Sequence, residues 1–195
     1  LPAGRQVDDW DFTTSATPQA ILKLFPNAFY DNKFGTVGIP AEKSKIVEVT
    51  TFRTETVYKD RRHPEKVEWG KTVEEDLARR DFTINAIALN LEDQKLIDPF
   101  EGQKDLKNKI IKAVGNPKLR FKEDALRLLR GVRLATQLDF QIEEETLAEI
   151  KKDSNLLEDI SKERVREELI KILESDNPYN GIVLLEDLEL LRYII

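Results

Sequence analysis

The sequence lacks cysteine and methionine altogether and has one histidine, His63, among its 195 residues. Without cysteine there can be no disulfides or thiolate metal sites, and one imidazole is too few for the common kinds of zinc site. Any metal ion must therefore be bound by carboxylate oxygens, which favours magnesium or a similar hard cation. Because methionine is absent, Leu1 is not a translational start, and we expect the native chain to begin further upstream.

Long apolar runs are also missing from the sequence. No run approaches the roughly 20 residues of a membrane-spanning helix, and no charged and apolar leader is present at the N-terminus. We therefore expect a globular, cytoplasmic protein with no membrane partner. The net charge of −6 argues mildly against nucleic acid as a partner, but the 31 lysine and arginine residues could still cluster on one surface.

The first part of the chain, up to about residue 115, has a mixed pattern. The pair Thr17 and Pro18 predicts a helix that runs to Phe25, since threonine is a common helix cap and proline suits the first turn. The charged segment from Tyr58 to Lys71 has no apolar period and is interpreted as a mobile loop, of a kind that is often functional. Segments rich in β-branched and aromatic residues predict strands at residues 11–14, 28–30, 36–39 and 46–52.

Beyond residue 115 the pattern is typical of helices alone. Leu126, Leu129 and Val132 recur at helical spacing, and later groups do the same. These groups are Leu147 and Ile150, then Val165, Leu169 and Ile172, with Ser161 as a cap before the last of them. We expect an α+β fold, with a mixed β-sheet in a head at residues 1–115 and an all-α neck at residues 116–195.

Carboxylates near the N-terminus are candidates for a metal site. Asp9 and Asp11 are separated by Trp10, so in a strand their side chains would lie on one face while the indole enters the core. Glu48 lies in a predicted strand and could supply a third oxygen ligand if the sheet brings it beside the pair. Taken alone, a pair of aspartates at this spacing is more often ordinary surface charge.

Arg79 and Arg80 are candidates for binding phosphate at the start of a predicted helical run, because a guanidinium group can bind two phosphate oxygens. The alternative is an exposed helix face on which they pair with the acidic residues 74–76. Asn85 follows one turn later and could either hold a ribose hydroxyl or fix Asp81.

Asp124 and Arg127, three residues apart on a predicted helix face, place an acceptor beside donors. Cytosine and adenine present an exocyclic amine next to a ring nitrogen acceptor, whereas uracil and guanine present a carbonyl next to an N–H. The pair would therefore accept C and A and reject U and G. Arg130 and Arg133 continue the same side at successive turns, where a triphosphate could lie. The alternative is an ordinary ladder of salt bridges along a helix.

In chain order, these clusters resemble the head and neck of class II tRNA nucleotidyltransferases, the bacterial CCA-adding type within the DNA polymerase beta superfamily. The resemblance covers nearly all 195 residues. The matching motifs are residues 9–14 (metal-binding), 79–86 (ribose and triphosphate), 98–106 (head–neck link), 123–127 (amino-acid template) and 160–164 (last neck motif). Such a series of motifs in one order is a specific signal.

The resemblance implies roles for individual residues. Asp9 and Asp11 would bind the catalytic Mg²⁺ ions, and Glu48 aligns with a third carboxylate of some members. The segment at residues 58–70 resembles the flexible loop with which members switch from C to A addition. The nucleotide-binding residues would be Arg80, Asp124, Arg127, Arg130 and Arg133, with Asp124 and Arg127 as the base template.

The implied reaction is the addition of CCA, from CTP and ATP, to the 3′ end of tRNA with release of pyrophosphate. The partners would be the tRNA 3′ end, CTP and ATP, and no protein partner is implied. Members carry a Gly-Gly-x-x-Arg-Asp element just before the paired aspartates, whereas this sequence begins after it, and the family's body and tail domains are missing. We therefore expect this stretch alone to be weakly active or inactive.

Related activities are the alternatives. A bacterial poly(A) polymerase would share the aspartate pair and the double arginine, but the intact Asp124 and Arg127 pair favours CCA addition. A partial enzyme that adds only A stays open, while the retained loop argues against one that adds only CC. A noncatalytic RNA-binding relative is disfavoured by the intact Asp9 and Asp11.

Overall fold

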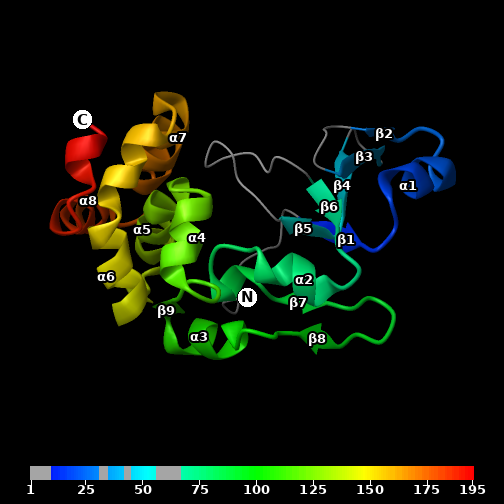
Figure 1. Cartoon of the computed structure of the whole chain (residues 1–195), viewed down its shortest axis with the longest axis horizontal. Coiled ribbons are helices and arrows are strands. Elements are labelled where there is room, and N and C mark those ends of the chain that lie inside the picture. Colours follow the sequence, from blue (N-terminus) through cyan, green and yellow to red (C-terminus); the bar gives the residue numbers. More distant parts are fainter. Residues whose placement is uncertain (1–9, 31–34, 42–44, 56–66) are drawn as a thin grey trace. The chain divides into compact units, whose positions relative to one another are not determined.

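The chain divides into two compact units, seen in a computed structural model that describes residues 10–30, 35–41, 45–55 and 67–195 (Figure 1). The first unit, here the sheet unit, comprises the described residues up to Arg79. The second, here the helical unit, comprises residues 80–195. No helix within the described residues is both long and apolar enough to cross a membrane.

The sheet unit is built on a four-stranded mixed sheet with the order β1-β4-β3-β2. Strand β1 runs parallel to β4, and β3 runs antiparallel to both β4 and β2, which confirms the predicted mixed sheet. The elements are β1 (Phe12–Thr14), α1 (Pro18–Leu24), β2 (Phe29–Tyr30), β3 (Thr36–Pro40), β4 (Ile46–Thr51), β5 (Arg53–Glu55), β6 (Val67–Trp69) and α2 (Val73–Ala78).

Local sequence signals account for the helices of the sheet unit. The Thr17 hydroxyl accepts a hydrogen bond from Ala20 N at 3.3 Å, so the predicted cap of α1 is confirmed, and the helix ends one residue before Phe25. Helix α2 begins with a capping box, in which Thr72 and Glu75 each bind the other's backbone N–H. These caps stabilise helices that are short enough to be marginal by themselves.

The segment predicted as a loop from Tyr58 to Lys71 is only partly described. Its residues 67–69 form strand β6, which pairs antiparallel with β5, so the loop prediction is wrong there. A three-residue strand gives too short a period to be recognised in a charged sequence. The remainder of the expected loop, up to residue 66, lies outside the described residues.

The helical unit contains the helices predicted from the apolar spacing. Its elements are η2 (Thr83–Asn85), β7 (Ala88–Leu89), β8 (Leu96–Ile97), α3 (Gly102–Asn108), β9 (Ile110–Ile111), α4 (Pro117–Glu123), α5 (Leu126–Leu138), β10 (Gln141–Ile142), α6 (Glu144–Lys152), η3 (Ser154–Asp159), α7 (Lys162–Leu173), α8 (Pro178–Asp187) and η4 (Leu191–Tyr193). The expected all-α neck thus also holds the two-residue strand β10, which pairs parallel with β9.

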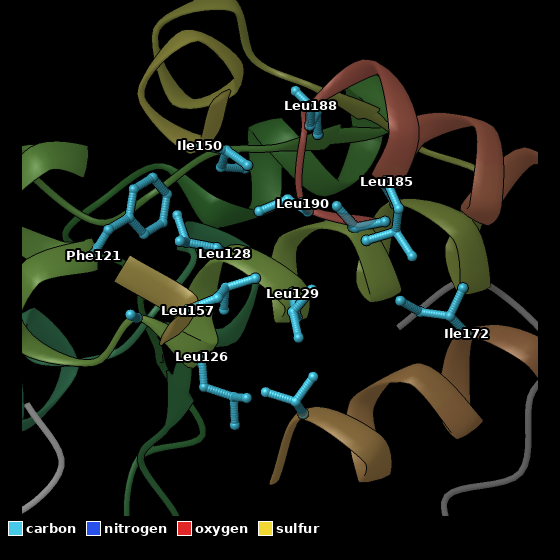
Figure 2. Close-up of a cluster of buried hydrophobic side chains, with 14 of the residues drawn as sticks. Phe121, Leu126, Leu128, Leu129, Ile150, Leu157, Ile172, Leu185, Leu188 and Leu190 are labelled. Carbon is cyan, nitrogen blue, oxygen red and sulfur yellow. The ribbon is translucent and has the colours of Figure 1, made fainter. Parts of the chain in front are cut away.

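One continuous apolar cluster holds the helical unit together, and α5 runs through its centre (Figure 2). Leu128, Leu129 and Val132 of α5 are fully buried, and α7 and α8 both pack on this helix. Gly131 lets α5 lie close to Phe82 and Ile150, because a Cβ at this position would lie 3.1 and 3.2 Å from their side-chain atoms. The position of α5 is therefore fixed by packing on several sides.

The two units do not divide at the boundary expected from the sequence. The change falls between Arg79 and Arg80, and β9 before residue 115 pairs with β10 after it. Gly102 of α3 also packs on the backbone of η2, where a Cβ would collide with the Thr83 carbonyl oxygen. The expected division into a head at residues 1–115 and a neck at residues 116–195 stays a prediction.

Candidate functional site

The sheet unit presents two of the predicted carboxylates at neighbouring positions, Asp11 just before β1 and Glu48 within β4. The parallel register of β1 and β4 pairs Phe12 with Val49, so Asp11 and Glu48, each one residue earlier, are neighbours. Both are exposed. Asp9 lies outside the described residues, and the Trp10 indole, expected in the core, is 60% exposed because β1 begins only at Phe12.

Two exposed carboxylates on neighbouring strands form a donor set that suits a hard cation such as Mg²⁺. Among the described residues, no group of three or more His, Asp or Glu side chains could hold a metal ion. The predicted ligand Asp9 falls outside that part of the chain. The chemistry of Asp11 and Glu48 is therefore compatible with the expected metal.

The double arginine lies at the end of a helix and not at its start. Helix α2 ends at Ala78, and the Arg79 Nε and Nη2 atoms lie 2.9 and 2.8 Å from Asp76 Oδ1. Asp76 is fully buried and also accepts from Arg53 N at 3.2 Å. Arg79 therefore pairs with one of the nearby acidic residues, as the alternative expected, but the pair is largely buried and does not lie on an exposed helix face. Arg80 is half-buried in the helical unit.

Asp81 is a buried carboxylate that fixes Arg130 of α5. The Arg130 Nε and Nη2 atoms lie 2.7 and 2.6 Å from Asp81 Oδ2, and Oδ1 accepts from Phe82 N at 2.8 Å and Asn85 Nδ2 at 3.1 Å. Asn85 therefore binds Asp81, one of its two predicted roles. Burial alone would raise the pKa of Asp81, but Arg130 and these donors together lower it below its ordinary value.

Arg130 lies among several acidic groups. Burial would lower the pKa of its guanidinium, but the negative charges of Asp81, Glu168 and Asp124 raise it. The Arg130 side chain is 35% exposed, against 7% for Asp81. Arg130 therefore remains charged and keeps part of its guanidinium open to solvent.

Asp124 is not part of a helix, in contrast to the prediction. It is an extended residue between α4 and α5, with φ −148° and ψ 106°. Its Oδ1 accepts a hydrogen bond from N of Leu126, the first residue of α5, at 3.0 Å. Both terminal nitrogens of Arg164 donate to the carboxylate, Nη1 to Oδ1 at 3.3 Å and Nη2 to Oδ2 at 2.8 Å. Asp124 is thus bound by α7 as well as by its own turn.

Arg127 lies in the first turn of α5 and is fixed from the preceding helix. Its Nη1 donates to Glu123 Oε2 at 2.6 Å and to the Arg120 carbonyl oxygen at 3.0 Å. Arg120 Nη1 donates to the same Glu123 oxygen at 2.6 Å. Asp124 and Arg127 are therefore each bound by a different partner, and not to each other.

Arg133 is bound two turns further along α5. Its Nε lies 2.8 Å from Oε2 of Glu168, a residue of α7 that is 3% exposed, and Lys171 Nζ donates to the other oxygen at 3.3 Å. Burial lowers the pKa of Arg133, and the charge of Arg130 adds to this, against the opposing effect of Glu168. The arginines at 127, 130 and 133 thus all lie on α5, and each has an acidic partner.

Sequence reasoning missed the partners that α7 supplies. Arg164 is 40 residues from Asp124 along the chain, and Glu168 is similarly far from Arg133. The only available signal for Arg164 was its place in the motif at residues 160–164, which gave it no role. A single sequence does not reveal which distant charges meet.

The chain thus contains a mixed sheet with exposed carboxylates and, in a second unit, helices that carry a row of arginines. A family model described as the poly A polymerase head domain matches residues 1–112, and the chain belongs to this family. A second model, described as a probable RNA and SrmB-binding site of polymerase A, matches residues 139–195.

Matches to individual proteins are more specific than the two family models. The CCA-adding enzyme of Ligilactobacillus salivarius is 47% identical over 97% of this chain and 47% of its own length. The Bacillus stearothermophilus CCA-adding enzyme, solved with CTP, is 38% identical with a TM-score of 0.87, over 97% of this chain and 46% of that one.

A third similar protein is a tRNA nucleotidyltransferase solved with a primer tRNA and an incoming ATP analog. It is 33% identical with a TM-score of 0.80, over 98% of this chain and 55% of that one. The chain spans about half the length of the curated relatives it matches. The predicted fold class and the resemblance to tRNA nucleotidyltransferases are confirmed.

Proposed function

We propose that the protein containing this chain is a cytoplasmic tRNA nucleotidyltransferase that adds C and A, from CTP and ATP, to the 3′ end of tRNA and releases pyrophosphate. The observation that carries the proposal is the likeness of 97% of the chain, at a TM-score of 0.87, to a CCA-adding enzyme solved with CTP. The enzyme and its partners are proposed for the whole protein.

The nucleotide would be selected where α4 meets α5. Asp124 would accept a hydrogen bond from the exocyclic amine of cytosine or adenine, and Arg127 would donate to the adjacent ring nitrogen. Uracil and guanine would place a carbonyl against the carboxylate and leave both polar groups without a partner. Support comes from the way in which Arg164 and Glu123 hold the two side chains, since fixed groups discriminate better than mobile ones.

The triphosphate would be held by arginines. Arg130 and Arg133 lie on successive turns of α5 with Arg127, and Arg80 would contribute from just before η2. The exposed part of Arg130 could bind a phosphate oxygen while its Nε and Nη2 remain on Asp81. Acidic partners that neutralise these arginines in the absence of nucleotide would keep a dense cationic cluster stable.

Asp9, Asp11 and Glu48 would hold Mg²⁺. When bound, the metal would lower the pKa of the tRNA 3′-hydroxyl and neutralise charge on the triphosphate. The residues of this chain would otherwise position the reactants, and no side chain would act as a nucleophile. The two-metal mechanism is part of this proposal.

Poly(A) addition is the second candidate, because the matching family model is described by that activity. The names of the more similar full-length relatives favour CCA addition instead. A partial enzyme that adds only A is a closer alternative, and the assay below distinguishes it.

The natural protein that contains this sequence tests the proposal. It would be incubated with a tRNA ending before CCA, a tRNA ending in CC, and a tRNA already ending in CCA as control, each with one labelled nucleoside triphosphate or with CTP and ATP together. We expect C on the first tRNA, A on the second and nothing on the control. Long A tails would support poly(A) polymerase, and incorporation of UTP or GTP as readily as CTP would contradict the template.

A further inference from the structure

The ion pair between Asp124 and Arg164 joins the proposed template residue to α7, a helix that has no other role in the proposed function. Both guanidinium Nη atoms face both carboxylate oxygens, at 3.3 and 2.8 Å, and the side chains are 20% and 22% exposed. A paired contact of this kind fixes the plane of the carboxylate as well as its position. A lysine at this position could supply the positive charge, but it has no planar pair of donors and so could not fix the plane of the carboxylate.

The hydrogen bonds of Asp124 leave a defined part of its carboxylate available. A carboxylate has about four acceptor positions. Among the described residues, Leu126 N and Arg164 Nη1 donate to Oδ1, and Arg164 Nη2 donates to Oδ2. About one position therefore remains, on Oδ2. A single remaining acceptor matches a single N–H from the exocyclic amine of a base.

Arg164 is itself held in place by the packing of α7. It lies in the first turn of this helix, next to Val165, which is 2% exposed in the apolar cluster. Glu168, one turn later, makes the second tie to α5 through Arg133. Helix α7 thus cannot shift along α5 without breaking a buried contact. The backbone that carries the Arg164 side chain is therefore held in place.

We propose that Arg164 is a positioning residue that sets the selectivity for C and A over U and G. It does so by fixing the carboxylate plane of Asp124 and occupying the acceptor positions that face away from the base. Without it, the carboxylate could rotate away from the O4 carbonyl of uracil and remain hydrated, so that the penalty against UTP would fall. This inference rests on the proposed function, in which Asp124 contacts the base.

The test compares single-nucleotide addition from CTP and from UTP by the natural protein and its variants. Arg164→Gln removes the charge and leaves one NH₂ group in place of the two nitrogens that donate to Asp124. Arg164→Lys keeps the charge without the planar pair of donors. Arg166→Gln is the matched control, because Arg166 is an exposed arginine on the same helix. KM and kcat are measured for each nucleotide, and thermal unfolding is followed by circular dichroism.

We expect the ratio of kcat/KM for CTP over UTP to fall by at least about tenfold in Arg164→Gln and by less in Arg164→Lys. The control should keep the ratio of the unaltered protein. A purely structural role would lower kcat/KM for CTP and UTP equally and leave the ratio unchanged, and this result in the folded variants would overturn the inference. If Arg164→Gln does not fold, the ratio in Arg164→Lys decides.

The failure of the inference and that of the proposed function give different results. If the unaltered protein adds neither C nor A to tRNA, the proposed function is wrong and the inference falls with it. If the unaltered protein prefers CTP over UTP and both Arg164 variants keep that preference, only the inference is wrong.

Discussion

The charged residues of the two units are arranged in opposite ways. In the sheet unit, Asp11 and Glu48 are exposed, and within the described residues neither side chain has an ion pair or hydrogen bond. In the helical unit, Asp124, Arg127 and Arg130 are each bound by an oppositely charged side chain. Groups that take up a cation must remain accessible to it, whereas groups that distinguish one base from another must not move.

The two units also differ in the size of their apolar interiors. The buried apolar residues of the described sheet unit are few, namely Ile21, Val37 and Leu77. The helical unit has a continuous cluster that connects η2, β9 and all its helices from α4 to α8. We therefore expect stability to be concentrated in the helical unit, and the site carboxylates of the sheet unit to matter for activity alone.

The largest expected effect is the loss of activity in Asp11→Asn. Replacing a proposed metal ligand should reduce nucleotide incorporation by about a thousandfold or more, since metal binding supplies several kcal/mol to such a reaction. Because Asp11 is exposed, the unfolding midpoint should stay unchanged. Incorporation on tRNA ending before CCA and tryptophan fluorescence on heating measure the two effects.

The matched control is Glu74→Gln, which neutralises another exposed carboxylate of the sheet unit. It should leave both incorporation and unfolding unchanged. Trp10 and Trp69 both lie in the sheet unit, so fluorescence reports on that unit. If Asp11→Asn retained activity, Asp11 would not be a metal ligand. The exposure of the carboxylates in the sheet unit could then not be explained by metal binding.

The next effect concerns stability in the helical unit. Leu129→Ala should lower the free energy of unfolding by about 3–5 kcal/mol, because Leu129 is fully buried at the centre of the cluster and a cavity would remain. Leu119→Ala on α4, where the side chain is 61% exposed, should change it by less than about 0.5 kcal/mol. Denaturant unfolding followed by helical circular dichroism measures both, and equal effects would contradict a single dense core.

The elements of the fold were largely predictable, because each depends on a local pattern. The apolar spacing of Leu126, Leu129 and Val132 gave helix α5, and Thr17 with Pro18 gave the start of α1. Strands shorter than four residues were missed where charges dominate, as in β6, and where helices surround them, as in β10. Such strands exist because a partner strand is nearby, and that is tertiary information.

The candidate site was predictable as a set of residues but not as a set of contacts. Asp124 and Arg127 were predicted to lie on one helix face, whereas Asp124 is an extended residue before the helix, where its side chain accepts a hydrogen bond from Leu126 N. The partner Arg164 comes from α7 and has no local signal. Charge pairing depends on which helices pack together, so it follows from the core and not from sequence spacing.

The buried pair of Asp81 and Arg130 should make the stability of the helical unit depend on pH. The pKa of Asp81 is lowered in the folded state, so its contribution is complete above the unfolded value near pH 4 and is lost as the pH falls through the folded value. Asp81→Asn should remove this dependence and cost about 1–3 kcal/mol at pH 7, because Arg130 loses its partner.

Unfolding by denaturant at a series of pH values from 7 downwards, followed by circular dichroism, measures this effect. Asp187→Asn serves as the control in the same unit, since Asp187 is a solvent-exposed residue at the end of α8. Its stability curve should run parallel to that of the unaltered protein. An equally steep acid loss in Asp81→Asn would show that other carboxylates govern the acid unfolding.

The smallest effect tests the sheet unit through the cap of helix α2. Thr72→Ala removes the side chain that accepts from Glu75 N and should cost about 1 kcal/mol, whereas Thr72→Ser keeps an oxygen there and should cost less. Because Asp76 of this helix also binds Arg53 N, loosening α2 should loosen β5 as well. The loss should therefore appear in tryptophan fluorescence, which reports on the sheet unit, and leave the helical circular dichroism transition nearly unchanged. A coincident shift of both transitions would mean that the two units unfold together. The difference between their apolar interiors would then not give them separate stabilities.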